Sequence, residues 1–265
     1  MRILITGAAG GLGRGLAVAF AGRGHDLALV DIDRAALDQT ALEVKAAGAD
    51  CRCYVVDVSD RARVQELADR IVSDIEGIDM LINNAGVLVV GDFVDTPIEE
   101  WDWLMGVNFW GYVYMIKAFL PGMIERGSGH VVNVSSIGGL MGCPIETTYA
   151  ASKFAISGMT EALYNELRDK GVKVTLVCPS SVATPILSTA HHFGYGEGYT
   201  QEIRRYWSMD LKKAIAEIVR GIEKGSFLVI AGKVGKIGYY SRRFSLSLYL
   251  ETQRRIYVRN QRYRV

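Results

Sequence analysis

The chain has 265 residues, 49% of them hydrophobic, and its charges almost cancel at a formal net charge of +1. This length and apolar content can build one large α/β domain or two small ones. No run of about 18 apolar residues is present, so the sequence argues against a membrane-spanning helix. The near-neutral charge gives no sign of a nucleic-acid partner.

The four cysteines, Cys51, Cys53, Cys143 and Cys178, show no C-x-x-C spacing. Because no His or Cys cluster accompanies them, we expect neither a zinc site nor another metal site. Unpaired cysteines suit a reducing compartment, so we expect a cytoplasmic protein. The segment after Met1 has the pattern of a strand and a glycine turn rather than of a secretory signal.

Short apolar runs predict buried strands at residues 2–6, 27–30, 51–56, 80–83, 130–134, 173–178 and 227–230. Amphipathic segments between them predict helices near 13–23, 34–47, 61–75, 98–125, 149–169 and 210–224. This alternation predicts an α/β protein with a single doubly wound, mostly parallel sheet of about seven strands, a Rossmann fold, with helices on both faces. We expect residues 1–232 to form this domain, with a substrate lid near 185–209 and a C-terminal extension at 233–265.

A glycine-rich turn follows the first predicted strand and opens the first predicted helix. Residues 6–13 read TGAAGGLG, with Gly7, Gly11 and Gly13 in a G-x-x-x-G-x-G spacing. Glycines let the backbone approach a pyrophosphate, and a helix N-terminus supplies N–H donors and the positive end of a dipole. The turn therefore predicts a dinucleotide site, although its spacing differs from the common G-x-G-x-x-G fingerprint.

Asp31 ends the second predicted strand, eighteen residues after Gly13. A carboxylate there can accept hydrogen bonds from an adenine-ribose diol and repels a 2′-phosphate, so we expect NAD as the cofactor. Asp31 could equally cap the following helix. Arg14 and Arg34 leave NADP open as the less favoured alternative, whereas Gly10 supports NAD because it puts no basic residue before the second motif glycine.

Tyr149 and Lys153 lie four residues apart in a predicted helix, with Ser136 thirteen residues upstream of Tyr149. Residues at i and i+4 share a helix face, so the phenol and the ammonium point into the same space. A nearby positive charge lowers the pKa of a phenol, which a proton-transferring Tyr requires. The alternative is an ordinary pair of helix-surface neighbours.

These motifs, with several further segments, resemble the short-chain dehydrogenase/reductase family over roughly residues 1–232. The resemblance rests on the turn at 6–13, on Asp57-Val58, on Asn83-Asn84-Ala85-Gly86, on Asn108, and on Ser136, Tyr149 and Lys153. It implies hydride transfer between NAD(H) and a secondary alcohol or ketone, with the catalytic residues Ser136, Tyr149, Lys153 and Asn108. The cofactor-binding residues that it implies are Gly7, Gly11, Leu12, Gly13, Asp31, Asp57, Val58, Asn84, Ala85, Gly86, Tyr149, Lys153, Val182 and Thr184.

The resemblance also implies a role for each catalytic residue. Tyr149 exchanges a proton with the reacting oxygen, which Ser136 holds in position. Asn108 anchors a water chain through which Lys153 reloads the proton. The thirteen-residue spacing selects Ser136 over Ser135, which we expect to face the other way.

One departure from the family pattern follows the sixth predicted strand. Many members carry Pro-Gly there, whereas this chain has Pro179-Ser180. Glycine permits a positive φ that serine tolerates less well, so the backbone near the nicotinamide is expected to differ. The resemblance implies that the Val182 backbone and the Thr184 hydroxyl hold the carboxamide.

The segment 185–209 follows a strand end and is expected to border the substrate pocket. Glycines at 194, 196 and 198 punctuate it, as in a lid that closes over a hydrophobic ligand. We therefore expect an apolar substrate, such as a lipid, steroid or hydroxyacyl group; the alternatives are a loop packed on the domain surface or against a neighbouring subunit. Its ring-bearing side chains are His191, His192, Phe193, Tyr195, Tyr199, Tyr206 and Trp207.

The extension at 233–265 carries nine Lys and Arg against one Glu. Phe244, Leu246, Leu248 and Leu250 alternate as in a strand, although Phe244 and Leu248 also fit helical spacing. Three interpretations stay open: peripheral contact with a membrane surface, packing in a homo-oligomer, or arginines that are solvated or paired with acidic residues of the body. The resemblance implies a homodimer or homotetramer formed through the helices at 98–125 and 149–169.

Two other functions compete with an NAD-dependent dehydrogenase, namely a catalytically silent dinucleotide sensor or scaffold and an NADP-dependent ketoreductase. The complete set of Ser136, Asn108, Tyr149 and Lys153 argues against a silent protein. A nucleotide-sugar epimerase or dehydratase of related fold is less favoured still, because such enzymes usually carry a larger C-terminal substrate domain than we expect here.

Overall fold

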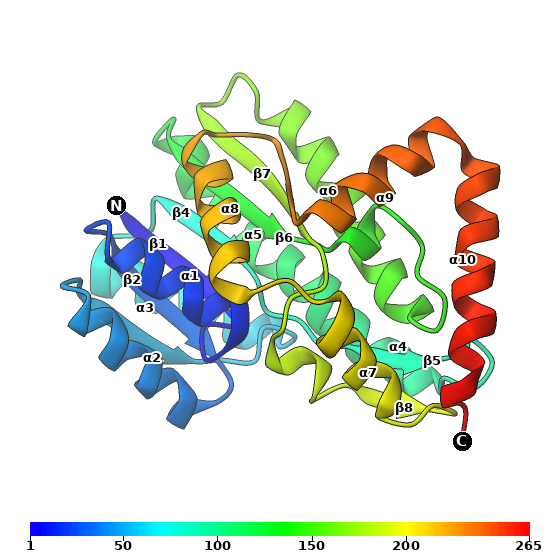
Figure 1. Cartoon of the computed structure of the whole chain (residues 1–265). Coiled ribbons are helices and arrows are strands. Elements are labelled where there is room, and N and C mark those ends of the chain that lie inside the picture. Colours follow the sequence, from blue (N-terminus) through cyan, green and yellow to red (C-terminus); the bar gives the residue numbers. More distant parts are fainter.

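The computed structural model describes residues 1–265, except for the side chain of Tyr206, so the lid prediction for Tyr206 lies outside the described residues. A seven-stranded sheet forms the centre, in the order β3-β2-β1-β4-β6-β7-β9, with neighbouring strands parallel (Figure 1). The predicted doubly wound α/β fold is confirmed. The strands are β1 (Arg2–Thr6), β2 (Asp26–Asp31), β3 (Cys51–Val55), β4 (Met80–Asn83), β6 (Gly129–Val134), β7 (Val172–Pro179) and β9 (Leu228–Ala231).

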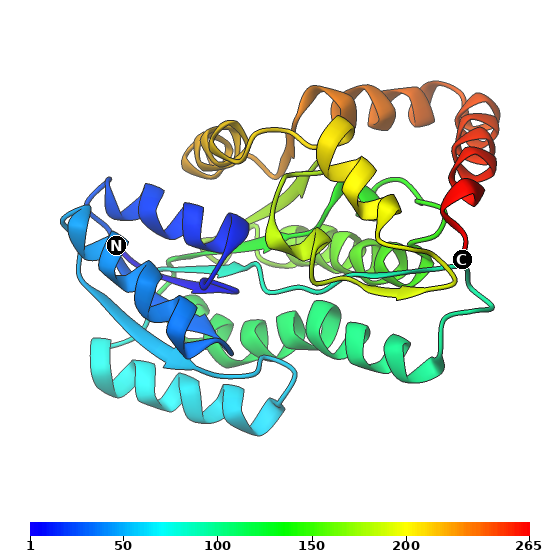
Figure 2. The same cartoon turned by 60° about the horizontal axis from the view of Figure 1, so that its bottom comes forward.

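Helices bury the sheet on both faces. Ile3, Leu4 and Ile5 of β1 are all fully buried, although successive side chains of a strand point to opposite faces. Such an unbroken apolar run is typical of a parallel strand covered on both sides. One face carries α1 (Gly11–Ala21), α2 (Arg34–Ala46) and α8 (Leu211–Glu223), and the other carries α3 (Arg61–Ile75), α5 (Gly111–Glu125) and α6 (Thr147–Glu166) (Figure 2).

Aspartates explain where three of these helices begin. The side chains of Asp33, Asp60 and Asp210 accept backbone N–H groups in the first turns of α2, α3 and α8. A carboxylate in this position satisfies donors that the helix itself leaves unpaired. The alternative that Asp31 caps α2 is therefore wrong, because Asp33 is the capping residue.

The helix predicted at 98–125 is interrupted in its middle. α4 (Ile98–Met105) runs through a π-helical turn (Gly106–Trp110) into α5. Such turns are frequent at functional sites. This one holds the fully buried Asn108 side chain against Val87, which follows β4.

The predicted lid contains regular structure of its own. After a short turn of 3₁₀ helix (Pro185–Leu187), β8 (His191–Phe193) pairs in parallel with β5 (Val89–Gly91) in a separate two-stranded sheet. α7 (Gly198–Glu202) and a π-helical turn (Ile203–Trp207) follow. The insert is therefore joined to the body through its backbone at β5.

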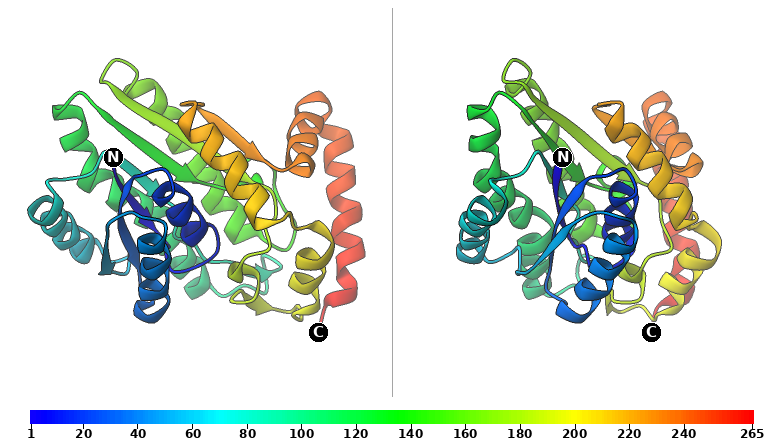
Figure 3. Two further views of the ribbon diagram at one scale, coloured as in Figure 1. Left: turned by 60° about the vertical axis from the view of Figure 1, so that its left-hand side comes forward. Right: turned by 90° about the vertical axis from the view of Figure 1, so that its left-hand side faces the viewer.

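The C-terminal extension is helical. α9 (Lys233–Phe244) and α10 (Leu246–Asn260) are separated by Ser245, whose hydroxyl accepts the Leu248 N–H and caps α10. The strand-like alternation from Phe244 onward therefore forms no strand. Figure 3 shows α10 standing beside α7 at the edge of the molecule. Within the described residues, no helix combines the length and apolar character needed to cross a membrane.

Candidate functional site

The glycine turn after β1 has a shape that needs glycine. Gly7 and Gly11 have positive φ angles of 65° and 53°, which residues with a Cβ rarely adopt. At Gly13 a Cβ would lie 2.0 Å from the Gly7 carbonyl oxygen. Glycine therefore lets the turn fold tightly just before α1, whose N-terminal N–H groups are the kind of donors that a pyrophosphate requires.

Asp31 lies at the end of β2, beside this turn. Its carboxylate accepts backbone N–H groups from Ala9 at 2.9 Å and from Ile32 at 2.7 Å. The bond to Ala9 fastens the glycine turn to β2 and holds the half-buried carboxylate at the mouth of the turn. The structure thus brings together the two features from which the sequence predicted a dinucleotide site.

The segments after β4 and β7 reach the same edge of the sheet. The Thr6 hydroxyl accepts the N–H groups of Asn84 at 2.9 Å and of Ala85 at 3.1 Å. Thr184 is buried beside Gly11, where a Cβ would stand 3.2 Å from its side chain. Because parallel strands end together at one edge, residues far apart in the sequence surround the turn.

Four further predicted cofactor residues have packing or turn contacts. The Asp57 carboxylate accepts the N–H and the hydroxyl of Ser59, so it shapes its own turn. Val58 is buried, and Leu12 packs against the core. Val182 forms an isolated backbone bridge with Met209 at the end of the insert.

Serine replaces the family's glycine after β7 without backbone strain. Ser180 is not among the residues with positive φ. Its hydroxyl accepts the N–H of Gly235 at 3.0 Å, and a Cβ on Gly235 would lie 2.4 Å from that hydroxyl oxygen. The Pro-Ser departure therefore connects the start of α9 to the end of the sheet.

Lys153 and Asn108 converge beside Gly86. A Cβ on Gly86 would lie 3.2 Å from Asn108 Oδ1 and 3.5 Å from Lys153 Nζ. The ammonium of Lys153 donates to the Val134 carbonyl oxygen at 3.1 Å and lies 5.7 Å from the centre of the Tyr149 ring. The predicted helix face of Tyr149 and Lys153 therefore points to the segment that follows β4.

Hydrogen bonds fix the other two predicted catalytic side chains. Asn108 donates to the Val87 carbonyl oxygen and accepts the Val87 N–H, at 3.0 and 2.8 Å. The Ser136 hydroxyl accepts the Gly138 N–H at 3.0 Å. Ser135 is buried and donates to the Lys153 carbonyl oxygen at 2.9 Å, so its hydroxyl is used in a contact with the backbone of α6.

The protein's own groups shift the pKa of Tyr149 in the direction opposite to our prediction. Burial raises the pKa of Tyr149 above its ordinary value and outweighs the hydrogen bond from Ser136, which lowers it. Burial also lowers the pKa of Lys153 to about 8. Lys153 can therefore lose its proton near neutral pH, whereas the Tyr149 phenol stays protonated.

The sequence indicated no specific role for Glu146, which directly precedes α6 and lies three residues before Tyr149. Tyr199 of the insert donates to Glu146 Oε1 at 3.0 Å, and burial raises the pKa of this carboxyl to about 7. An acidic residue at a helix start is too common to predict such a role. Only the fold brings Tyr199 to it.

A polar cluster joins the insert to the extension. Glu202 of α7 accepts from the Tyr263 hydroxyl and the Arg262 guanidinium, and Arg259 lies 3.7 Å away. Arg264 donates to Asp92 and Asp95 of the body. These arginines are paired with acidic residues, as one of the three interpretations of the extension predicted.

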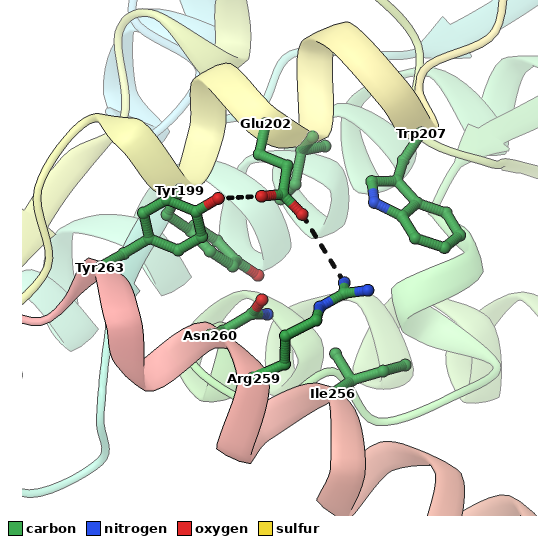
Figure 4. Close-up of a pocket in the computed structure, with 8 residues that line it drawn as sticks. Tyr199, Glu202, Trp207, Ile256, Arg259, Asn260 and Tyr263 are labelled. Carbon is green, nitrogen blue, oxygen red and sulfur yellow. Dashed lines mark hydrogen bonds and ion pairs between the residues drawn. The ribbon is translucent and has the colours of Figure 1, made fainter.

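A cavity of about 130 Å³ separates the insert from α10 (Figure 4). It is lined by Tyr199, Glu202, Ile203, Trp207, Ile256, Arg259, Asn260 and Tyr263.

His191 of the insert has structural contacts. His191 Nδ1 lies 2.8 Å from a Glu100 carboxylate oxygen, and its ring stacks on Trp103 at 4.3 Å between centres. No group of three or more His, Cys, Asp or Glu that could hold a metal occurs in the part of the chain that the structure describes.

Comparisons with known proteins agree on one family. A family model of short chain dehydrogenases matches residues 1–193. The putative oxidoreductase SadH of Mycobacterium tuberculosis is 35% identical over 241 residues, which cover 88% of this chain and 86% of that protein. Epidermal retinol dehydrogenase 2 of Mus musculus is 40% identical over 186 residues, or 69% of this chain and 60% of that protein.

Solved structures extend the similarity over most of the chain. A short-chain dehydrogenase/reductase from Burkholderia phymatum in complex with NAD has a TM-score of 0.86 and 30% identity, covering 93% of this chain and 94% of that one. A short-chain dehydrogenase from Sphingobium yanoikuyae in complex with NADPH has a TM-score of 0.77 and 27% identity, covering 86% of each chain. The chain belongs to the short-chain dehydrogenase family of oxidoreductases.

Proposed function

We propose that the protein transfers a hydride between NAD(H) and an apolar secondary alcohol or ketone, with Tyr149 as acid and base. One observation carries the proposal: Lys153 and Asn108 converge on Gly86, at the sheet edge that also holds the glycine turn and Asp31. Such a reaction needs a proton-transferring phenol, a nearby ammonium and a glycine turn that can bind a dinucleotide, all at one edge of the sheet.

The residues present fit a nicotinamide dinucleotide. The glycine turn would take the pyrophosphate, and Asp31 the adenine ribose. Thr184 and the Val182 backbone would hold the carboxamide. When bound, the cofactor would supply the hydride acceptor or donor and, in its oxidised form, a positive charge that lowers the pKa of a nearby phenol.

The chain's own residues would handle the proton. In alcohol oxidation the Tyr149 phenolate takes the alcohol proton while the Ser136 hydroxyl donates to the reacting oxygen. In ketone reduction Tyr149 gives the proton back. Lys153, with its pKa lowered to about 8, can reload Tyr149 near neutral pH. Asn108, held on both sides by Val87, keeps a fixed amide beside Lys153.

NAD is the cofactor that Asp31 favours. Its carboxylate, held by Ala9 at the turn, would accept from a ribose diol and repel a 2′-phosphate. Relatives in solved structures carry either NAD or NADPH, so the choice has to be measured on this chain. A strong preference for NADP in steady-state kinetics would contradict the role of Asp31.

The surroundings of Tyr149 support an apolar substrate. Tyr149 packs on a cluster whose buried members include Leu88, Leu187, Tyr195 and Tyr199. Three of these come from the insert and one from the segment after β4, so they would border a ligand at Tyr149 from two sides. Activity on polyols alone in a panel of steroid, lipid and polyol alcohols would overturn this substrate class.

Tyr149→Phe tests the central assignment. We expect turnover to fall by at least about a hundredfold, because the proton-transferring group is gone, while NAD binding measured by calorimetry is retained. Near-normal turnover of the variant would show that Tyr149 is not the acid and base. If the natural chain binds NAD but converts no alcohol or ketone, the sensor or scaffold alternative is favoured instead.

The outer face of α9 supports membrane contact. Val234, Ile237, Tyr240 and Phe244 follow helical spacing and are exposed, Phe244 to 93%. Residues 224–250 contain basic residues and no Asp or Glu. We propose that this apolar stripe docks on an anionic membrane surface, where an apolar substrate would also partition.

Point variants test this better than removing the extension, because buried Tyr249 and Asn260 connect α10 to the body. Phe244→Ser should reduce flotation with phosphatidylserine-containing vesicles, whereas Leu42→Ser, on the exposed side of α2, should not. Unchanged flotation would remove the membrane proposal. A smaller molecular mass of the variant on size-exclusion chromatography would instead support packing of the extension in a homo-oligomer.

A further inference from the structure

Glu146 is held in place by a backbone conformation that is rare for its neighbour. Ile145 has a φ of 72°, in the left-handed region, and its side chain is buried. A β-branched residue there is strained by about 1–3 kcal/mol, and such strain persists where surrounding structure enforces it. Here the Ile145 carbonyl oxygen accepts the Gly91 N–H at 2.7 Å. The strained turn fixes where Glu146 starts α6.

The Glu146 carboxyl lies among neutral groups. Cys143 of the preceding loop, Tyr149 of α6 and Tyr199 of α7 are the titratable neighbours that interact with it. No Lys or Arg pairs with it among the described residues. An unpaired carboxylate is poorly solvated there, so burial raises its pKa to about 7.

The hydrogen bond from Tyr199 leaves one side of the carboxyl unused. Tyr199 donates to Oε1 at 3.0 Å, and the side chain is still partly accessible to solvent. In its protonated form the carboxyl has an O–H of its own to donate. Glu146 is one turn from Tyr149 on the same helix, so a ligand at Tyr149 comes within reach of it.

Contacts to the extension hold Tyr199 in turn. The Tyr263 carbonyl oxygen accepts the Gly196 N–H at 2.9 Å, and the Tyr199 and Tyr263 rings lie edge to face at 6.4 Å. Tyr263 also donates to Glu202, in the same helix as Tyr199. The pair of Tyr199 and Glu146 is therefore supported from both sides, as a rigid recognition element requires.

We propose that Glu146 determines specificity by donating a hydrogen bond to a second oxygen of a neutral substrate, such as a hydroxyketone, diketone or diol, and by rejecting substrates with an anionic group at that place. The proposal rests on the proposed function, since the first oxygen is the one that reacts at Tyr149. A neutral hydrogen-bond donor in an apolar wall of the site favours a substrate that carries an acceptor at that place. The reason is that a buried polar group without a partner is unfavourable. A carboxylate on the substrate would meet no cation there.

Matched ketones test the proposal. Cyclohexanone is compared with cyclohexanedione, and oxocyclohexanecarboxylate with its methyl ester, together with their decalin homologues. The natural chain should favour the second oxygen by roughly tenfold in kcat/KM, the loss expected for one hydrogen bond, and should reduce the ester but not the acid. Glu146→Leu should abolish the preference for the diketone, whereas Glu146→Gln, which still donates N–H, should keep it.

The pH profile separates recognition from a merely structural role. In the natural chain the KM for the diketone should rise above pH 7, because the ionised carboxyl no longer donates. In Glu146→Gln the KM should stay flat, while Tyr149 and Lys153 titrate in both proteins and affect kcat. An equal preference for the diketone in the natural chain and in both variants would overturn the inference but not the proposed function. A KM that rises with pH in Glu146→Gln would do the same. Failure of the natural chain to reduce any ketone overturns the proposed function and the inference with it.

Discussion

Glu146→Gln should change the pH dependence of folding stability. The ordinary pKa of a Glu carboxyl is 4.5, and burial raises it to about 7 in the folded protein. At about 1.4 kcal/mol per pKa unit, this difference corresponds to at most ~3.5 kcal/mol. Water reaching the partly accessible side chain screens the interaction, so we expect about 2 kcal/mol.

The sign follows from which state binds the proton more tightly. The folded protein holds the Glu146 proton up to about pH 7, whereas the unfolded chain releases it near pH 4.5. The protonated carboxyl therefore contributes its full stability below pH 4.5, and this stability is lost as the pH rises to about 7. Glu146→Gln cannot ionise, so the natural chain should become less stable relative to the variant across this window.

Urea unfolding followed by tryptophan fluorescence, at several pH values from about 4.5 to 8, measures this difference. Other groups titrate equally in both proteins and cancel in the comparison. Glu99→Gln, on the exposed first turn of α4, serves as the matched control. A difference between the natural chain and Glu146→Gln that varies by less than about 0.5 kcal/mol would refute the argument, because the carboxyl would then ionise as freely as in water.

Three further substitutions test other parts of the site. Gly13→Ala should weaken NAD binding by at least about tenfold in a fluorescence titration, because its Cβ would lie 2.0 Å from the Gly7 carbonyl oxygen and displace the turn. Asp31→Ser should raise kcat/KM with NADP relative to NAD by about tenfold or more, since it removes the charge that repels a 2′-phosphate. Asp92→Ala should lower the free energy of unfolding in urea by about 2 kcal/mol, because this carboxylate accepts from Tyr195, Tyr257 and Arg264.

The sheet could be predicted from the sequence because each of its strands has a strong local signal. The sequence neighbours of Leu4 in β1 are apolar as well. Asp33 and Asp60 mark the starts of the helices that follow β2 and β3. A parallel strand that is buried on both faces can be recognised in the sequence from its own apolar run, even when the strands that pair with it are unknown. The right-handedness of the crossovers then limits the orders in which the strands can pair.

The two short strands that join the insert to the body could not be predicted. β5 and β8 have three residues each, and they exist only because they pair with one another across the fold. The secondary structure of the extension could not be predicted from its pattern for a related reason. Its leucines alternate at period two, yet in α10 only Tyr249 of that stretch is buried, so the exposed leucines carry no strand information.

In the candidate site, too, local features could be predicted and features that depend on distant contacts could not. Tyr149, Lys153 and Ser136 could be proposed from their spacing, because a helix and a turn set their geometry locally. The direction of the Tyr149 pKa could not be predicted, since it depends on how deeply the fold buries the phenol. Glu146 could not be found either, because its partner Tyr199 lies 53 residues away in the sequence.

The contacts of the insert suggest where to look for this chain's own substrate specificity. The family match ends at residue 193 and includes the residues that we assign to cofactor and proton transfer. Beyond it, the insert and the extension bind to each other: the Val265 N–H donates to Gly194, and Gln261 donates to the Tyr195 hydroxyl. The final arginines are used in these internal contacts, whereas the stripe of α9 and the leucines at 246, 248 and 250 stay exposed. Substitutions in the last nine residues should therefore change substrate choice through Tyr199, and substitutions in α9 should change where the enzyme acts.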